Sequence, residues 1–441
     1  MESPVIDKTA LVQVLGCKVN QAEAASMAVI LEQGGYRIDQ TFAEPDLVVI
    51  HTCCVTGKAE GKSRRMVNRM VQKYPSSRVL VTGCLAEMDP LRLKEISERV
   101  VVLGTFEKEH LPDLIQSDGI NFEGIARRGS SACANFVDLG SPGLSGRART
   151  FLKVQDGCSQ RCTYCIVPAA RGPSRSLPAQ AVVDQARKLG TDGFAEIVLT
   201  GIHLGHYGRD FRPRTSLEAL LERLLNECPA SRFRLSSIEP QEISPHIIEL
   251  VAESPRLCRH FHIPVQSGDD GILKRMGRPY DTTMIHDLMR RISTRIPEAC
   301  VGLDIMVGFP GEDELSFRKT ENLIRTLAPA YLHVFPFSPR PGTLAASFKP
   351  KVAEKSKRLR VEELRSLSKV LRRRFYERFL GTMFSVAPES QPESPNGLII
   401  ARTDNYIPVR VRVPPALQDR PTFEVIIEKV ESEEVWGTCQ P

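Results

Sequence analysis

The sequence predicts an α/β protein: an open parallel α/β sheet at the N-terminus, a central partial (β/α)6 barrel and a small antiparallel β-barrel at the C-terminus. Strand-like apolar runs alternate with helical stretches over residues 10–104, and the alternation resumes from 150 with six further strands. From 381 onward, short strands follow one another without helices. Alternating strands and helices are typical of a parallel sheet covered by helices, whereas strands alone are typical of a sandwich or barrel.

Length and composition are those of an ordinary globular protein. The 441 residues are 41% hydrophobic and 25% charged, which suggests roughly three domains at ~150 residues each. No apolar run reaches the ~18 residues of a membrane span, and the segment MESPVIDKTA lacks the features of a signal peptide. Twelve cysteines without such a signal favour a reducing, cytoplasmic compartment, and metal binding over disulfides. The net charge of +6 is only weak evidence for nucleic-acid binding.

The domain boundaries follow from changes in pattern. We expect the N-terminal sheet domain over 1–116, the central barrel over 148–376 and the C-terminal barrel over 377–441. Residues 117–147 are rich in Gly, Ser, Arg and Ala and show little periodicity, which is typical of a linker. Cys133 lies in this linker, and we expect no role for it.

Three strands of the N-terminal domain each end in a cysteine: Cys17, Cys53 and Cys84. Ligands of open α/β sheets lie at the carboxyl ends of the strands, so we expect these three thiols to converge on one site. Cys54 competes with Cys53 for the second position, and the pattern alone leaves both open. We expect strands at 10–17, 46–53, 78–84 and 101–104, and helices at 20–34, 58–73 and 90–99.

The central barrel shows six strand candidates separated by helical stretches. These strands are expected at 150–156, 195–201, 232–240, 260–268, 301–312 and 331–338. The active site of such a barrel lies at the carboxyl ends of its strands. Those ends carry polar residues or glycine here, which makes them candidate ligand contacts: Asp156, Thr200, Gly201, Ser237, Glu239, Gln266, Ser267, Gly308 and Glu312.

The most specific motif is CxxxCxxC in GCSQRCTYC, formed by Cys158, Cys162 and Cys165. Protein four-iron clusters normally take four thiolates, so three at this spacing leave one iron open. Structural zinc requires a complete set of four Cys or His. No further Cys or His follows until His203 and His206, which we expect to be loop residues. The motif therefore predicts a [4Fe–4S] cluster with an open iron.

An open iron suggests a specific cofactor, because it can bind the amine and carboxylate of S-adenosylmethionine. Electron transfer into the sulfonium then gives a 5′-deoxyadenosyl radical. Tyr164, between two of the cysteines, is placed to pack against the adenine. The second cysteine triplet offers another open iron as a site for sulfur, so the two triplets together predict insertion of sulfur into a C–H bond. The rest of the cofactor is expected to bind Thr200, Gly201, Ser237, Glu239 and Gln266.

A basic helix precedes the C-terminal barrel. Residues 349–380 form an amphipathic pattern with 12 Lys or Arg against 4 Asp or Glu, a local net charge of +8. Arg372, Arg373 and Arg374 form its densest cluster. The barrel that follows has the size of RNA-binding accessory barrels. We therefore expect this region, and the three arginines first, to contact RNA phosphates.

Several segments resemble a known family, the radical S-adenosylmethionine methylthiotransferases, and the likeness covers nearly the whole chain, including a C-terminal TRAM-type barrel. The segments GCKVNQ, ARGPSRS and LHVFPFSPRPGT are similar to the bacterial branch that acts on N6-threonylcarbamoyladenosine in tRNA. The segments that carry the family resemblance are LGCKVNQAE (15–23), TCCVTGKAEGKSR (52–64), TGCLAE (82–87), QDGCSQRCTYCIVPAARGPSRS (155–176), LSSIEP (235–240), PVQSGDDGILKRMGR (264–278) and DIMVGFPGE (304–312).

The resemblance implies an activity and its cofactors. The product would be 2-methylthio-N6-threonylcarbamoyladenosine at position 37 of tRNA, made with two [4Fe–4S] clusters and S-adenosyl-L-methionine. One S-adenosylmethionine would methylate a sulfur on the auxiliary cluster, and another would supply the radical that takes hydrogen from carbon 2 of the adenine. The ligands of the auxiliary cluster would be Cys17, Cys53 and Cys84, which favours Cys53 over Cys54.

The implied partners are the tRNA anticodon loop, with the base unstacked, and an electron donor such as a flavodoxin or ferredoxin. We expect no membrane contact and a monomeric chain. Two positions depart from the family pattern. His51 stands where Asn is usual, which would alter hydrogen bonding near the auxiliary cluster, and Leu177 stands where Arg is expected, which would remove an RNA or linker contact.

Three alternatives stay open. The first is the family branch that acts on isopentenyladenosine in tRNA. The second is a non-catalytic iron–sulfur RNA-binding protein, which would form no deoxyadenosine from S-adenosylmethionine. The third is a radical enzyme whose N-terminal cysteines are structural, which would hold one cluster instead of two, about four irons in place of about eight.

Overall fold

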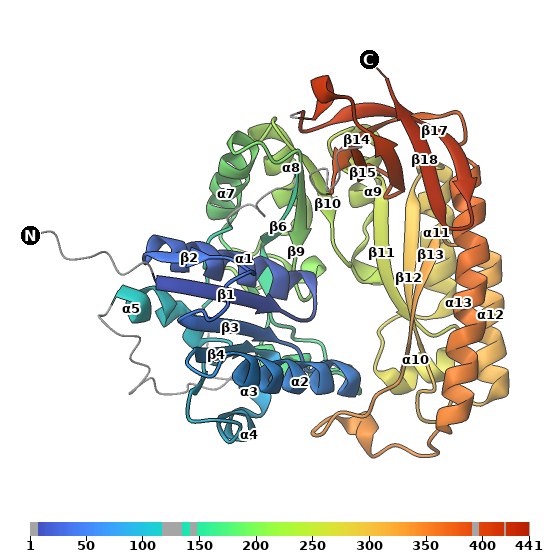
Figure 1. Ribbon diagram of the computed structural model, residues 1–441. Helices are drawn as coiled ribbons and strands as arrows, with labels where there is room; N and C mark the ends of the chain where they lie inside the picture. Colours follow the sequence, from blue (N-terminus) through green and yellow to red (C-terminus); the bar gives the residue numbers. More distant parts are fainter. Residues whose placement is uncertain (1–7, 117–134, 142–147, 390–396, 419, 441) are drawn as a thin grey trace, which may run out of the picture. The chain divides into compact units, whose positions relative to one another are not determined.

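The computed structural model describes residues 8–116, 135–141, 148–389, 397–418 and 420–440. These form two compact units (Figure 1). The first comprises Met1–Pro142, Gln155–Leu177 and Ser338–Thr343, and the second comprises Gly143–Val154, Pro178–Phe337 and Leu344–Pro441. Most of the expected linker, Cys133 included, lies outside the described residues. The expected domain limits stay predictions.

The first unit is built on a five-stranded sheet in the order β2-β1-β3-β4-β5, in which every neighbouring pair is parallel. The central strand, β3, is buried along its whole length, because helices cover both faces of the sheet (Figure 1). Its strands and helices are β1 (Lys8–Val14), α1 (Lys18–Gln33), β2 (Tyr36–Ile38), β3 (Leu47–Thr52), α2 (Gly57–Lys73), β4 (Arg78–Gly83), α3 (Cys84–Met88), α4 (Pro90–Lys94), β5 (Val100–Val102) and α5 (Leu111–Gln116).

The sequence misses two features of this sheet. The edge strand β2 has only three residues, too short for a periodic pattern to show. The helix expected over 90–99 ends at Lys94. The first unit also holds the hairpin of β7 (Gln155–Asp156) and β8 (Arg175–Ser176), with α6 (Val167–Arg171) between its strands. The cysteine loop therefore belongs to the same compact unit as the N-terminal sheet.

The second unit contains the six expected barrel strands, which form two parallel three-stranded sheets, β10-β9-β6 and β11-β12-β13. Isolated parallel bridges, Phe233 with Leu257 and Ser237 with His262, join β10 to the second sheet. The order β6-β9-β10-β11-β12-β13 is that of a partial (β/α)6 barrel. The strands are β6 (Arg149–Lys153), β9 (Glu196–Thr200), β10 (Arg232–Leu235), β11 (His260–Gln266), β12 (Cys300–Val307) and β13 (Tyr331–Pro336).

Several helices of this barrel begin with side-chain N-caps that the sequence supplies. Ser216, Ser244, Asp281 and Asp313 each accept a hydrogen bond from a backbone N–H in the first turn. The helices are α7 (Ala179–Thr191), α8 (Leu217–Glu227), α9 (Pro245–Glu253), α10 (Asp270–Met276), α11 (Thr282–Arg295), α12 (Glu314–Leu327) and α13 (Glu354–Glu377).

The C-terminal strands close into a barrel in the order β14-β15-β16-β18-β17. Four neighbouring pairs are antiparallel as expected, but β16 and β18 run parallel, so the expected antiparallel pattern is incomplete. The barrel shares one apolar core cluster with Cys300, Tyr331 and Phe375 of the second unit. Its strands are β14 (Met383–Pro388), β15 (Leu398–Thr403), β16 (Pro408–Arg412), β17 (Phe423–Glu431) and β18 (Glu434–Cys439).

Within the described part of the chain, no helix has the length and hydropathy that a membrane span requires.

Candidate functional site

The CxxxCxxC loop is held by tight backbone contacts. Gly157 has a φ of +70°, and a Cβ there would lie 2.0 Å from the carbonyl oxygen of Pro173, so only glycine fits. The backbone N–H of Cys158 donates to the carbonyl of Gly172 at 3.0 Å, and that of Cys165 to the carbonyl of Cys162 at 3.1 Å. All three cysteines of the motif, and Tyr164, are partly exposed. The loop therefore presents three thiols on a fixed backbone.

The three N-terminal cysteines converge as the sequence predicts. Cys17 precedes α1, Cys53 follows β3 and Cys84 begins α3 after β4. A Cβ on Gly16 would lie 3.2 Å from the sulfur of Cys53, which brings the ends of β1 and β3 together. Burial, and then the neighbouring Cys84, raise the pKa of Cys53 to about 12. A metal centre bound there would supply the positive charge that offsets the burial of thiolates.

Cys54 lies in a different environment. It is fully buried in an apolar core cluster with Val48 and Val67, among others. Burial raises its pKa above the ordinary value for a thiol. Cys84 belongs to the same cluster, so burial alone does not separate Cys54 from a ligand. Cys53 is favoured because its sulfur would lie 3.2 Å from a Cβ on Gly16, the residue before Cys17.

Arg171 connects the two groups of cysteines within the first unit. Its side chain is completely buried, and its Nε lies 3.4 Å from the sulfur of Cys84. Its two terminal nitrogens donate to Asp156, which leads into the CxxxCxxC loop, at 2.8 Å and to Asn20 at 2.8 Å. Although burial alone would lower the pKa of Arg171, Asp156 and Glu23 hold it well above the usual value. A permanent positive charge therefore lies beside the thiols.

His51 takes part in a buried charge cluster behind these cysteines. Its Nε2 lies 2.8 Å from a carboxylate oxygen of Glu23, which also accepts from Lys108 at 2.6 Å. Burial lowers the pKa of His51 to about 4. A Cβ on Gly83 would lie 2.7 Å from Nδ1 of His51, so the imidazole packs directly under the residue before Cys84. His51 thus hydrogen-bonds within a buried cluster next to the cysteine-bearing strand ends, and its effect relative to the Asn of the family pattern stays a prediction. The other, Leu177, is buried.

In the second unit, the strand ends carry the polar residues expected to contact S-adenosylmethionine. Thr200 ends β9 and is buried, and Gly201 follows it. Ser237 follows β10, and its hydroxyl lies 3.2 Å from Nδ1 of His262. Both carboxylate oxygens of Glu239 accept from Nη1 of Arg278 at 2.7 Å.

Gln266, at the end of β11, shows the strongest local sign of a ligand. Its φ is +69°, in the left-handed region that favours glycine, and a bulge precedes it. Its Oε1 is buried, and no hydrogen-bond partner for it exists among the described residues. Buried polar atoms are normally paired, so this oxygen is available to a bound hydroxyl or amine.

The glycine-rich turn after β12 has a structural role. Gly308 has a φ of +75°, and a Cβ there would meet the side chain of Lys357 on α13 at 2.3 Å. Its N–H donates to Glu312 at 2.8 Å, and Glu312 pairs with Arg360, also on α13, at 2.7 Å. This turn therefore anchors α13 to the barrel.

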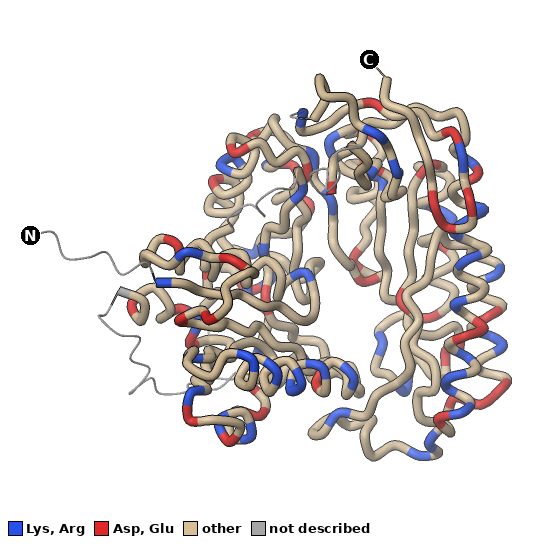
Figure 2. Tube along the Cα trace, in the orientation of Figure 1, with Lys and Arg blue, Asp and Glu red and all other residues tan. Residues whose placement is uncertain are grey.

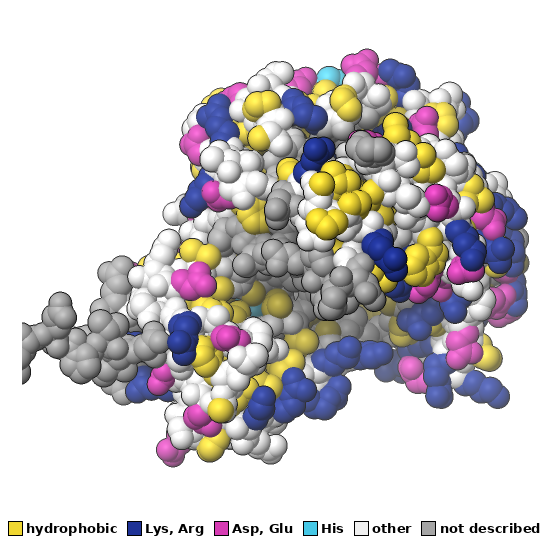
Figure 3. Space-filling model, turned by 45° about the horizontal axis from the view of Figure 1, so that its top comes forward, with side chains coloured by type: hydrophobic (Ala, Val, Ile, Leu, Met, Phe, Trp, Pro, Cys, Tyr) yellow, Lys and Arg dark blue, Asp and Glu magenta, His cyan; other side chains and the backbone are white. Residues whose placement is uncertain are grey.

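Much of the positive charge of α13 is neutralised locally. Arg372 is half-buried and pairs with Glu433 at 2.9 Å, and Arg373 is exposed and pairs with Glu377 at 2.7 Å. Arg374 is exposed. Acidic residues interrupt the Lys and Arg residues along α13 (Figure 2). In the space-filling view, Lys and Arg gather at the right edge with Asp and Glu among them (Figure 3).

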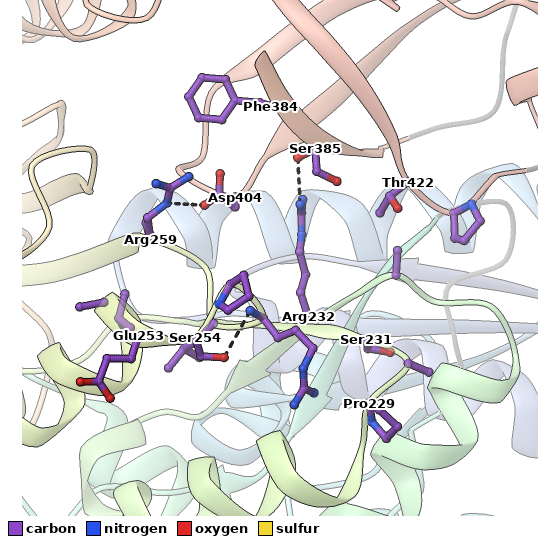
Figure 4. A pocket seen from close by; sticks show the side chains of 18 of the residues that line it. Pro229, Ser231, Arg232, Glu253, Ser254, Arg259, Phe384, Ser385, Asp404 and Thr422 are labelled. Carbon is purple, nitrogen blue, oxygen red and sulfur yellow. Dashed lines mark hydrogen bonds and ion pairs between the residues drawn. The ribbon is translucent and has the colours of Figure 1, made fainter. Parts of the chain in front are cut away.

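A groove of about 600 Å³ lies between the central and C-terminal barrels of the second unit (Figure 4). Arg259 pairs with Asp404 at 2.6 Å, and Arg232 donates to the carbonyl of Ser385 at 3.0 Å. Ala195 and Arg232, at the amino ends of β9 and β10, line it. Since barrel active sites lie at the opposite strand ends, the groove is a seam between the barrels and not a candidate active site.

Comparison with known proteins agrees with this architecture. Residues 9–104 match a family described as "Uncharacterized protein family UPF0004", and residues 152–324 match the radical SAM superfamily. A solved structure of the radical S-adenosylmethionine methyltransferase TsrM from Kitasatospora setae shares the fold, with a TM-score of 0.56 and 16% identity over 77% of each chain. Residues 152–324 thus form a radical SAM domain.

Curated relatives define the family more narrowly. The threonylcarbamoyladenosine tRNA methylthiotransferase MtaB of Bacillus subtilis is 35% identical over 90% of this chain and 88% of its own length. The MtaB protein of Thermotoga maritima is 34% identical over 87% of both chains. A tRNA-2-methylthio-N(6)-dimethylallyladenosine synthase of Pelotomaculum thermopropionicum is 33% identical over 88% of both. The chain belongs to the tRNA methylthiotransferases.

The pattern of the sequence does not predict a functional role for Arg171 or Arg278. Arg171 contacts Asn20, 151 residues away, and Arg278 contacts Glu239, 39 residues away. Each stands inside a segment that carries the family resemblance, which is the one signal that could have found them.

Proposed function

We propose that this enzyme adds a methylthio group to carbon 2 of N6-threonylcarbamoyladenosine at position 37 of tRNA. The observation that carries the proposal is the presence of two cysteine triplets in one compact unit, with Arg171 bonded to Cys84 of one triplet and to Asp156, two residues before the other. Relatives named for this substrate are 31–35% identical over most of the chain. The alternative substrate, N6-isopentenyladenosine, is kept because a relative named for it is 33% identical.

The donor sets fit two [4Fe–4S] clusters with three thiolates each, from Cys158, Cys162 and Cys165 and from Cys17, Cys53 and Cys84. In bound form, one cluster with S-adenosyl-L-methionine supplies a carbon-centred radical, and the other supplies a place for sulfur. The chain's own task is to hold these groups, orient the adenosine and keep water out.

The strand ends of the second unit suit S-adenosylmethionine. Glu239 and Arg278 present a carboxylate and a guanidinium side by side, which match the amine and carboxylate of an amino acid. The unpaired Oε1 of Gln266 suits a ribose hydroxyl. Thr200, Gly201 and Ser237 complete the binding surface, and Tyr164 of the cysteine loop is assigned to the adenine.

Arg171 has a separate task. Its charge lies beside Cys84, and it is fixed by Asp156, Asn20 and Glu23. Its Nε donates to the sulfur of Cys84 and so orients this side chain for ligation. We assign to the tRNA the exposed basic face of α13, led by Arg373 and Arg374, and to the reductant a flavodoxin or ferredoxin. A cytoplasmic, monomeric enzyme is expected.

Nucleoside mass spectrometry of tRNA tests this proposal. In a deletion strain, 2-methylthio-N6-threonylcarbamoyladenosine should vanish and N6-threonylcarbamoyladenosine should accumulate, while 2-methylthio-N6-isopentenyladenosine stays. The wild-type gene should restore the product, and a Cys158→Ala gene should not, because the loop then retains two thiols. Loss of the isopentenyl product alone would establish the alternative substrate.

A further inference from the structure

The middle of the central barrel carries a group of polar side chains on three adjacent strands. They are His262 on β11, Asp304 on β12 and His333 on β13. The residues that precede Asp304 and His333 in the strands, Leu303 and Leu332, have the opposite orientation and are buried. On this outer side, α13 packs against β13. Barrel interiors are usually filled by branched apolar side chains, so a polar group on the inner face suggests a ligand.

These side chains form one hydrogen-bonded chain. Nε2 of His262 lies 2.8 Å from Oδ1 of Asp304, and Nδ1 of His333 lies 3.3 Å from the same oxygen. The hydroxyl of Ser237 lies 3.2 Å from Nδ1 of His262. Burial alone would raise the pKa of Asp304, but His262 and His333 hold it below the ordinary value. Asp304 is therefore a carboxylate that fixes both imidazoles.

His333 is the accessible end of this chain. Its side chain is 56% exposed, on the edge strand of the described sheet. Among the described residues, its Nε2 makes no hydrogen bond. The ring centroid of His333 lies 4.7 Å from that of His262 and 5.1 Å from that of Tyr331. The surroundings of His333 are thus polar and aromatic.

We propose that His333, positioned by Asp304 and His262, is the contact that selects a polar, hydrogen-bonding substituent on N6 of the target adenosine. The inference rests on the proposed function. A threonylcarbamoyl group carries a urea, a hydroxyl and a carboxylate, whereas an isopentenyl group is a hydrocarbon. Nε2 accepts from a urea N–H or hydroxyl in the neutral imidazole and donates to a carboxylate in the imidazolium.

The selection works through the partner that the wrong substrate lacks. A hydrocarbon placed against His333 would leave its nitrogen without a hydrogen bond and without water. Sites built to hydrogen-bond a substrate group reject the analogue that lacks it far more strongly than apolar pockets reject an extra group.

The test compares His333→Phe with wild type on two purified tRNAs, one carrying N6-threonylcarbamoyladenosine and one carrying N6-isopentenyladenosine. Phenylalanine keeps a ring and removes both nitrogens. For His333→Phe we expect kcat/KM on the first tRNA to fall by roughly tenfold or more. The ratio of kcat/KM on the first tRNA to kcat/KM on the second should therefore decrease. His333→Asn should recover part of the loss. His246→Phe, which alters an exposed histidine on α9, should behave as wild type.

Two further measurements separate the explanations. Deoxyadenosine formation without tRNA should be unchanged in His333→Phe, because His333 does not take part in making the radical. An unchanged ratio between the tRNAs, or a loss of deoxyadenosine, would overturn the inference. So would a divalent metal bound at one per chain in wild type and absent in His333→Phe, since two histidines and an aspartate can also hold a metal. If wild type leaves the first tRNA unmodified, the proposed function fails instead.

Discussion

Neighbouring residues Cys53 and Cys54 have different environments. Cys53 lies against Gly16 at the sheet edge, and Cys54 lies in the apolar core. We therefore expect Cys53→Ala to hold about four irons per chain in place of about eight, to form deoxyadenosine and to make no methylthiolated product. Cys54→Ala should keep all the irons, because only a packed side chain is lost. Anaerobic iron analysis with both assays measures this. The reverse pattern would assign the ligand to Cys54.

Arg171 has no exposed surface and four polar partners, so we expect its substitution to lower the free energy of unfolding. In Arg171→Met the carboxylates of Glu23 and Asp156 stay buried with less compensation. Removing one partner of a buried ion pair costs about 3–5 kcal/mol. We expect that loss in the free energy of urea unfolding. We also expect fewer irons per chain, because Cys84 loses the adjacent cation.

The control for Arg171 is Arg69→Met, which changes an exposed arginine on α2. It should alter the unfolding free energy by less than about 0.5 kcal/mol. If Arg171→Met unfolds like this control and binds iron like wild type, the arginine does not stabilise the cysteine site.

Among single residues, the sequence predicts best the positions of those that lie at the ends of parallel strands. Cys17, Cys53 and Cys84 could be brought together because parallel strands end on one edge. Arg171 could not be predicted, because its contacts depend on how 155–177 folds onto the N-terminal sheet, and no periodic pattern encodes that placement. The orphan oxygen of Gln266 depends on a bulge and a positive φ, which are equally invisible in composition.

At the scale of elements, α13 has two faces with different tasks. Lys357 and Arg360 are buried and bind the GFPGE turn, whereas Arg373 and Arg374 are exposed. The positive charge that the surface of α13 can present to RNA is therefore smaller than the number of Lys and Arg residues in 349–380 suggests. Most helix positions follow the periodicity, because amphipathic patterns depend directly on burial; the helix expected over 90–99, which ends at Lys94, is an exception. The parallel pair β16 and β18 was missed, because antiparallel order is the default for short consecutive strands.

The exposed arginines of α13 give a testable prediction. The double charge reversal Arg373→Glu with Arg374→Glu should weaken tRNA binding and flatten its salt dependence by roughly one unit of slope per lost phosphate contact. Arg372 is left intact because its reversal would break the pair with Glu433 and disturb the fold. The measurement is a salt titration of tRNA affinity.

Arg290→Glu on α11 is the matched control, since Arg290 is exposed and pairs with an acidic residue one turn away. It should leave the slope unchanged. Equal slopes for the double variant and wild type would remove Arg373 and Arg374 from the RNA contact.

At the scale of the whole molecule, the C-terminal barrel is part of the second compact unit and not a freely attached module. Glu196 on β9 is completely buried and pairs with Arg149 at 2.8 Å and Arg234 at 2.7 Å. Arg234 also donates to the backbone carbonyls of Thr403 and Asp404 at 3.0 and 2.8 Å. The same charge cluster therefore orders the amino ends of the central strands and holds the loop after β15.

This cluster predicts that the two barrels unfold together. Glu196→Gln removes the carboxylate that pairs with Arg149, Arg232 and Arg234, and among the described residues only Arg149 then keeps a carboxylate partner, Glu389. The buried cations therefore repel one another. We expect a loss of about 3–5 kcal/mol in the free energy of unfolding, with fluorescence of Trp436 in β18 and far-ultraviolet circular dichroism changing in one coincident urea transition. Glu222→Gln, at an exposed pair with His246, should cost less than about 1 kcal/mol. A Trp436 transition separate from the circular dichroism transition would show instead that the C-terminal barrel folds independently.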